Sequence, residues 1–157
     1  MTNRIWFIFA VIIFLFSCYK GSLYEKNIDV EKGLWQISDT LKFEPKIEDN
    51  LPKNLYVNIR HTSAFNWRNL WLNLQIVFPN DSVVNEKINI QLSQPNGQWY
   101  GKCSGDVCLI QIPVENYEQY SFTDTGVYTF ALSHEMRENP LENILSMGIK
   151  IEDIKEE

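Results

Sequence analysis

The sequence predicts an all-β protein: an antiparallel two-sheet β-sandwich of about 7–9 strands, preceded by a lipoprotein signal peptide and a tether. Apolar and polar residues alternate with a period of two in several segments, which indicates strands with one buried and one solvated face. Turn-forming Pro, Asn, Asp and Gly residues separate these segments, and repeated short strands joined by turns are typical of two packed sheets. An apolar segment near the N-terminus is interpreted as an export signal that precedes this domain.

That segment is an uninterrupted apolar run at residues 5–16. It is shorter than the ~20 residues of a membrane-spanning helix and matches the hydrophobic region of a secretory signal. The run ends in Leu15-Phe16-Ser17-Cys18, which resembles the bacterial lipobox, although Phe16 is bulkier than usual there. We expect residues 1–17 to be a removed signal peptide and Cys18 to be lipidated. A plain anchor helix or an ordinary secretion signal is the alternative.

The chain is acidic, with 14 Lys and Arg against 20 Asp and Glu and a net charge of −6. The expected signal peptide contains Arg4 and no acid, so its removal makes the protein more acidic still. This balance disfavours nucleic acid, whose binding depends on clustered cations. It also disfavours adsorption to anionic lipid, so the acyl chains of Cys18 would attach the protein to the membrane. No small-molecule substrate is expected.

Residues 18–33 are predicted to be the lipidated cysteine and a polar tether, because they show little periodicity. The sandwich is then expected over residues 34–157, with its first packed residue near Leu34 or Trp35. Period-two alternation is strongest in residues 55–60, 69–78, 87–92 and 127–132. Shorter strands are expected at 34–43, 98–101, 107–113 and 147–152, and short helical turns at 114–120 and 137–146.

Two further cysteines, Cys103 and Cys108, enclose Gly105. Because disulfides persist in exported proteins, we expect these cysteines to form a bond that contributes about 2 kcal/mol. Redox chemistry is disfavoured, since the spacing is not Cys-x-x-Cys. A zinc site is disfavoured as well, because His61 and His134 would both have to converge on the pair, and neither belongs to a ligand motif.

Recognised catalytic motifs are absent from the sequence. His61 and His134 each lie at the end of a predicted strand beside an arginine, which would not favour a neutral base, and we interpret both as structural. Paired carboxylates for glycoside hydrolysis stay open as a weak alternative, because sequence alone does not exclude them. We therefore predict a protein that is not an enzyme and needs no metal or cofactor.

The segment from Arg60 to Trp71 is the most unusual mixture of polar and aromatic residues. If Leu70 and Leu72 face the core, Trp71 faces outward, as Arg60 does on its own strand. Outward Trp and Arg are enriched at binding hot spots, which makes four residues candidates for partner binding: Arg60, Trp67, Arg68 and Trp71. Tryptophan also stacks on sugars, so glycan binding stays open, and so does simple packing of Trp71 under a neighbouring loop.

Two triplets, Asp39-Thr40-Leu41 and Asp81-Ser82-Val83, resemble the short acceptor sequence for O-linked glycans in Bacteroidetes secretory proteins. Thr40 and Ser82 are therefore hypothetical glycosylation sites.

Several motifs in a fixed order resemble one family. After the lipobox and Trp35 come LYVNIRH at 55–61, FNWRNLWL at 65–72, GQWYG at 97–101, HEMRENPL at 134–141 and MGIKI at 147–151. This series is similar to the gliding-motility lipoprotein GldH family of the Bacteroidetes, over nearly the whole mature chain. The resemblance implies an accessory of the gliding machinery, associated with type IX protein secretion, without catalytic residues.

Tyr19 to Ser22, which follow the lipidated cysteine, contain no acids and so lack the acidic run that marks Bacteroidetes lipoproteins for surface display. We expect anchoring to the outer membrane, on its periplasmic face. There the domain would act as an adaptor for other envelope proteins of gliding and secretion. The alternative is a carbohydrate- or peptidoglycan-binding module.

Overall fold

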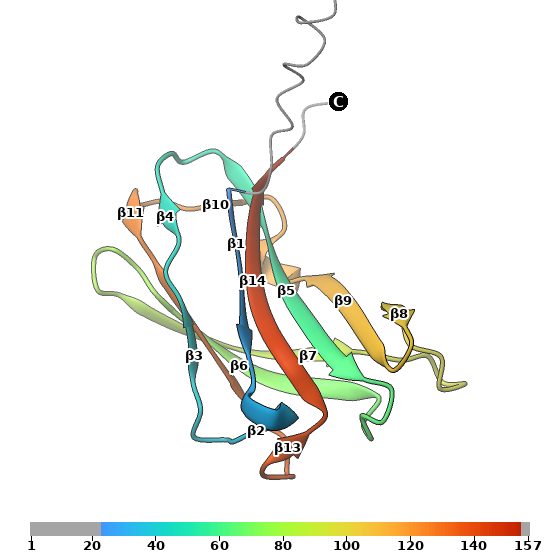
Figure 1. The fold of residues 1–157 in the computed structure, drawn as a ribbon. Helices are drawn as coiled ribbons and strands as arrows, with labels where there is room; N and C mark the ends of the chain where they lie inside the picture. Colours follow the sequence, from blue (N-terminus) through green and yellow to red (C-terminus); the bar gives the residue numbers. More distant parts are fainter. Residues whose placement is uncertain (1–22, 155–157) are drawn as a thin grey trace, which may run out of the picture.

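A computed structural model describes residues 23–154 and shows two facing antiparallel sheets (Figure 1). The first, the β5 sheet, has the order β1-β14-β5-β9-β8, with β10 also pairing with β5. Its strands are β1 (Tyr24–Asp29), β5 (Pro52–Thr62), β8 (Lys102–Ser104), β9 (Val107–Pro113), β10 (Tyr120–Ser121) and β14 (Ile144–Asp153).

The second, the β6 sheet, has the order β3-β12-β6-β7. Its strands are β3 (Leu41–Phe43), β6 (Asn69–Val77), β7 (Val83–Gln91) and β12 (Thr129–His134). Two small ribbons flank the sheets, β2 (Leu34–Trp35) with β13 (Leu141–Glu142) and β4 (Lys46–Ile47) with β11 (Gly126–Val127). Two short 3-10 turns complete the described part, η2 (Glu31–Gly33) and η3 (Glu115–Tyr117).

The predicted all-β sandwich is therefore confirmed. Leu70, Leu72, Leu74 and Ile76 of β6 are fully buried, while the residues between them are partly or well exposed. The inward positions of β5 behave in the same way. Each buried aliphatic side chain of this size contributes about 1.5–3 kcal/mol. The described strands outnumber the prediction because several contain only two or three residues, too short to show a period.

The domain begins earlier than predicted, because β1 belongs to the β5 sheet. Its residues pair with β14 from Tyr24 opposite Ile151 to Asp29 opposite Ser146. Residues 24–33, expected to belong to a tether, are thus part of the fold. An edge strand that buries little apolar surface gives no clear alternation, which explains the error. The pairing also places the first and last described residues at the same end of the sandwich (Figure 1).

Three local predictions are corrected. Residues 34–43 form two strands, β2 and β3, in different sheets. Residues 98–101 contribute only an isolated bridge between Trp99 and Ser93. The helical turn expected at 137–146 is absent; Asn143, with φ 68°, instead makes a tight turn between β13 and β14. The apolar spacing of Leu141 and Leu145 suits either a helix or two short strands joined by a turn. The turn predicted at 114–120 is confirmed as η3.

Candidate functional site

The outer face of the β6 sheet presents Trp71, whose surface is 37% exposed. Amide side chains lie around it on β6 and on the neighbouring β7. Asn69 Nδ2 donates to Asn89 Oδ1 at 2.8 Å, and Gln75 Nε2 donates to Asn85 Oδ1 at 3.1 Å. These cross-strand bonds link the amides of the two strands. The result is an exposed aromatic ring within a polar, ordered surface.

Trp71 is held in place by residues that sequence analysis did not single out. The Nζ atom of Lys87 lies 5.3 Å from the centre of the indole ring, and Lys87 forms an ion pair with Glu135. Glu135 N–H donates to the Trp71 carbonyl at 2.8 Å, and Trp71 N–H donates to Met136 Sδ at 3.4 Å. A cation–π contact at an exposed site is worth about 0.5–1 kcal/mol. The alternation of β7 alone could have placed Lys87 outward, but not beside Trp71.

Trp67 and Arg68 lie in the loop that leads into β6. Trp67 is 40% exposed, and its Nε1 donates to Glu138 Oε2 at 2.7 Å. The carbonyl of Arg68 accepts hydrogen bonds from the N–H groups of Leu92 and Ser93 at 2.8 and 3.2 Å, while the residue as a whole is exposed. Both residues therefore border the β6 sheet.

Arg60 lies elsewhere. It is an exposed residue of β5, paired with Leu109 of β9 and Ser146 of β14, and it belongs to the outer face of the β5 sheet. The core separates this face from Trp71. The four candidate residues thus do not form one surface: Trp71 lies on the outer face of the β6 sheet, Trp67 and Arg68 lie in the loop that borders this sheet, and Arg60 lies on the outer face of the β5 sheet.

A cavity of about 420 Å³ opens beside Trp71 at the edge of the sandwich, and we call it the edge cavity. Its walls come from β7 of one sheet and from the end of β9 together with η3 of the other. Its apolar lining includes Ile88 and Ile90 on β7 and Ile112 and Val114 from the other sheet. Sequence analysis missed this cavity, because only the tertiary structure brings these segments together.

His134 is buried at the end of β12, with both ring nitrogens bonded. Its Nε2 lies 3.1 Å from the carbonyl of Trp35, and its Nδ1 accepts from Met136 N–H at 3.3 Å. This pattern fits the neutral ring with hydrogen on Nε2. Burial lowers the pKa of His134, although the carbonyl of Trp35 and the charge of Asp39 oppose that shift.

His61 is also buried, beside the disulfide. Its Nδ1 lies 2.9 Å from the carbonyl of Thr62, whereas Nε2 is a buried nitrogen for which the described structure contains no hydrogen-bond partner. The ring centre lies 4.6 Å from that of Trp99. Burial lowers the pKa of His61, opposed by the hydrogen bond to Thr62. Both histidines therefore occupy packed positions within the fold, as their structural interpretation requires.

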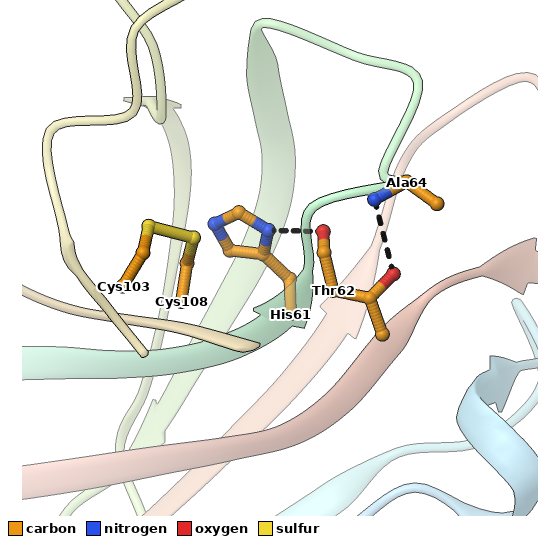
Figure 2. The surroundings of a disulfide bond; sticks show 5 residues. All are labelled: His61, Thr62, Ala64, Cys103 and Cys108. Carbon is orange, nitrogen blue, oxygen red and sulfur yellow. Dashed lines mark hydrogen bonds between the residues drawn. A yellow bond between two sulfur atoms is a disulfide. The ribbon is translucent and has the colours of Figure 1, made fainter. Parts of the chain in front are cut away.

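The structure joins Cys103 and Cys108 in a disulfide across β8 and β9, with the two Cα atoms 4.0 Å apart. Cys108 is fully buried and lies opposite His61 in the sheet, while Cys103 is exposed. Figure 2 shows the His61 ring beside the disulfide, with its hydrogen bond to Thr62 on the opposite side. The bond thus closes the β8–β9 hairpin over the His61 side chain.

Lys53 is a buried cation that sequence analysis did not identify. Its side chain is fully buried, and Nζ lies 2.6 Å from Asp49 Oδ1 and 2.8 Å from Asp153 Oδ1. Burial by itself would lower the pKa of Lys53, but the hydrogen bonds and charges of Asp153 and Asp49 outweigh it and raise the pKa. No sequence signal marks this group, because its two partners come from different segments of the chain.

The remaining predicted sites are less informative. Thr40 and Ser82 are both exposed, and Ser82 lies in the turn between β6 and β7. Cys18 lies outside the described residues. Residues 23–154 contain no group of three or more His, Cys, Asp or Glu side chains arranged to hold a metal ion. None of the helices described is both long and apolar enough to cross a membrane.

The fold and these surfaces define a β-sandwich protein with ordered polar faces on both sheets. The family model for GldH lipoprotein matches residues 22–151. The chain therefore belongs to the GldH lipoprotein family, as its motifs indicated.

Two curated proteins are similar along nearly their whole length. The "Gliding motility lipoprotein GldH homolog" of Christiangramia forsetii is 29% identical, over 93% of this chain and 92% of its own. The "Gliding motility lipoprotein GldH" of Flavobacterium johnsoniae is 25% identical, over 89% and 90%. Among solved structures, the glucuronidase BtGH115A aligns with a TM-score of 0.43 and 11% identity, covering 88% of this chain but 18% of that enzyme. We draw no function from a structural likeness at this level.

Proposed function

We propose that this protein is a lipid-anchored, non-enzymatic adaptor of the gliding machinery, associated with type IX protein secretion. The observation that carries the proposal is the family match over residues 22–151, which includes almost the entire sandwich. Two curated relatives that span the same length are named for gliding motility. Similarity of this extent supports a shared role for the whole domain rather than for an isolated motif.

The surfaces of the sandwich support an adaptor role. Trp71 is exposed, yet Lys87 and Met136 hold it in a fixed position. A pre-ordered aromatic side chain loses little conformational entropy when a partner covers it, and tryptophan is among the residues most enriched at protein interfaces. Trp67, similarly exposed at 40%, lies in the loop that leads into the same strand.

Attachment would occur through acyl chains on Cys18, at the periplasmic face of the outer membrane. Because the first and last described residues lie at one end of the sandwich, a short link would leave the opposite end and both sheet faces accessible to neighbouring proteins. Several acyl chains together hold a protein far more firmly than one chain, which gives only marginal binding.

A crosslinking pull-down of the tagged, lipidated protein from its native envelope tests the proposal. Gliding or secretion proteins should be recovered with the native chain, and capture should fall with Trp71→Ala. The Cys18→Ala variant should lose acyl label and leave the membrane fraction. Recovery of no envelope protein in repeated experiments would contradict an adaptor role, and membrane retention of Cys18→Ala without acyl label would contradict lipid anchoring.

A specific observation also favours a second function, binding of a polysaccharide or of peptidoglycan. Trp71 lies among the amides of Asn69, Asn73 and Asn89 on a sheet face, and sugars bind to aromatic rings flanked by amide groups. A glycan binder should show a change in tryptophan fluorescence on titration with polysaccharide. Trp71→Ala or Trp67→Ala should abolish this change, whereas an adaptor should not respond to sugars at all.

A further inference from the structure

The outer edge of the β6 sheet is formed by β7, a strand of nine residues. Pairing with β6 uses only one of its two edges. Just after the strand, the Leu92 N–H donates to the backbone carbonyl of Arg68. Just before the strand, the Ser82 carbonyl accepts from the backbone N–H of Phe78. By alternation, the even-numbered residues of β7 bond to β6. The backbone N–H and C=O groups of Asn85, Lys87 and Asn89 therefore point away from the sheet.

Within residues 23–154, these outward groups have no backbone or side-chain hydrogen-bond partner. A long edge strand of this kind is a template for pairing with a further strand. The other edge of the β6 sheet, β3, has only three residues. Strand β7 is thus the longest exposed edge in the described fold.

The edge cavity lies directly beside this edge. Ile88 and Ile90 of β7 and Ile112 and Val114 of the opposite sheet provide apolar walls. On the outer side lie Trp71 of the neighbouring strand β6 and Lys87 of β7 itself. A strand added to β7 would alternate its side chains between these two environments, one set entering the cavity and the other lying beside Trp71.

We propose that β7 binds an extended, basic segment of a partner protein by strand addition. The Lys or Arg side chains of that segment enter the edge cavity, with their aliphatic stems along its apolar walls and their charges beside Glu86 and Glu115, while its apolar side chains lie beside Trp71. The inference deepens the adaptor function and rests on it. Strand addition combines main-chain hydrogen bonds with pockets for alternate side chains, and β7 offers both. The partner is identified by chemistry: a flexible or terminal segment in which apolar residues alternate with Lys or Arg.

The charges around this edge determine which sign of charge the partner segment should have. Glu86 and Glu115 line the cavity, and Tyr117 forms a hydrogen bond with Glu86. Lys87 is already neutralised by its ion pair with Glu135. The local surface is therefore acidic and complements a cationic segment. A second copy of this chain is a poorer occupant, because two-fold pairing about the middle of β7 would bring two Lys87 side chains together.

The inward Glu86 and the outward Lys87 are also residues of the type that protects edge strands from indiscriminate pairing. Glu86 disfavours neutral or acidic strands and so favours a partner that supplies positive charge, whereas the charge of Lys87 is compensated by Glu135. Glu86 can therefore both guard the edge and select its ligand.

The test uses the full lipidated chain in detergent and a fluorescent ten-residue peptide that alternates Val and Lys. Fluorescence anisotropy should detect saturable binding, and a Val–Glu peptide should bind at least 10-fold more weakly. Two isomeric Val–Lys peptides, N-methylated on opposite sets of alternate residues, separate backbone pairing from simple charge attraction. One isomer should lose at least 10-fold in affinity while the other binds.

Two protein variants complete the experiment. Asn89→Pro removes an outward N–H and should lower affinity at least 10-fold, with the fold checked by near-ultraviolet circular dichroism. Glu115→Lys should weaken binding several-fold even if Asn89→Pro misfolds, whereas Glu31→Lys, the same change at exposed η2, should not.

If both N-methylated isomers lose affinity equally, or if neither loses affinity, strand addition by a peptide is overturned. Self-association of the protein that depends on β7, detected by sedimentation, would overturn it as well. If no peptide binds but the pull-down recovers envelope proteins, this inference fails and the adaptor function stands.

Discussion

Arg60 and Trp71 lie on the outer faces of different sheets, although only the loop between β5 and β6 separates them in sequence. The buried residues of β5 and β6 fill the space between those faces. Two residues so placed cannot contact one small binding partner together. The predicted binding segment must therefore be treated as two surfaces, which can be tested separately.

The first prediction concerns these two surfaces. Trp71→Ala should reduce capture of envelope partners by at least 10-fold, because truncating a central aromatic at an interface costs about 2 kcal/mol or more. Arg60→Glu should retain those partners. Quantitative crosslinking of both variants, with unchanged thermal unfolding as the control for folding, makes the comparison. Loss of the same partners in Arg60→Glu would show that the β5 sheet contributes to binding.

The second prediction concerns pH. Burial lowers the pKa of both His61 and His134 below the ordinary value of 6.5, so the unfolded chain takes up protons more readily than the folded chain. Stability is then fully present above pH 6.5 and falls as the pH drops towards the folded-state pKa. The slope should reach about 1.4 kcal/mol per pH unit for each histidine.

Urea unfolding from pH 7.5 to 5 measures this slope. His61→Phe keeps an aromatic ring beside Trp99 and removes the buried Nε2, so it should flatten the curve. An unchanged slope in this variant would show that His61 does not take part in the transition.

The third prediction concerns the buried Lys53. The double variant Asp49→Asn/Asp153→Asn removes both carboxylates and should lower the free energy of unfolding by about 2–4 kcal/mol, because a buried charge loses its compensating partners. Lys53→Met removes the charge and keeps most of the volume, so it should cost less. Chemical denaturation compares the two. A greater cost for Lys53→Met would mean that the ion pairs themselves stabilise the fold.

The fourth prediction concerns Leu72, which is fully buried in β6. Leu72→Asp should unfold the domain, because burying an unpaired charge costs several kcal/mol, comparable with the whole stability of a domain. Leu72→Met conserves volume and should cost less than about 1.5 kcal/mol. Circular dichroism of both variants decides the matter, and a folded Leu72→Asp protein would contradict the assigned core.

The fifth prediction concerns the disulfide. Cys103 and Cys108 should resist alkylation in freshly isolated protein and react only after reduction, as measured by mass spectrometry. Cys103→Ala should lower the free energy of unfolding by about 2 kcal/mol, because the unfolded chain loses a small closed loop. Free thiols in the native protein would show that the bond does not form in the cell.

The local alternation of apolar and polar residues was sufficient to predict a strand and its inward residues where one face of the strand is buried and the other is exposed to solvent. The alternation in β6 placed Leu70 and Leu72 inward and Trp71 outward, and the burial of each residue agrees. Pattern failed for β1 and for residues 98–101. Strand β1 lies at a sheet edge and is held by pairing with β14, whereas residues 98–101 contain aromatic residues but make only an isolated bridge. Neither outcome depends on side-chain period.

The sequence by itself determined the all-β class, the inward and outward residues of the long strands, and the family, because these depend on residue type and spacing along the chain. Only the tertiary structure separated Arg60 from Trp71, paired Lys53 with Asp153, and formed the edge cavity between β7 and η3. Each of these depends on which strands become neighbours in a sheet. That choice is made by long-range backbone pairing and core packing, and a period of two does not encode it.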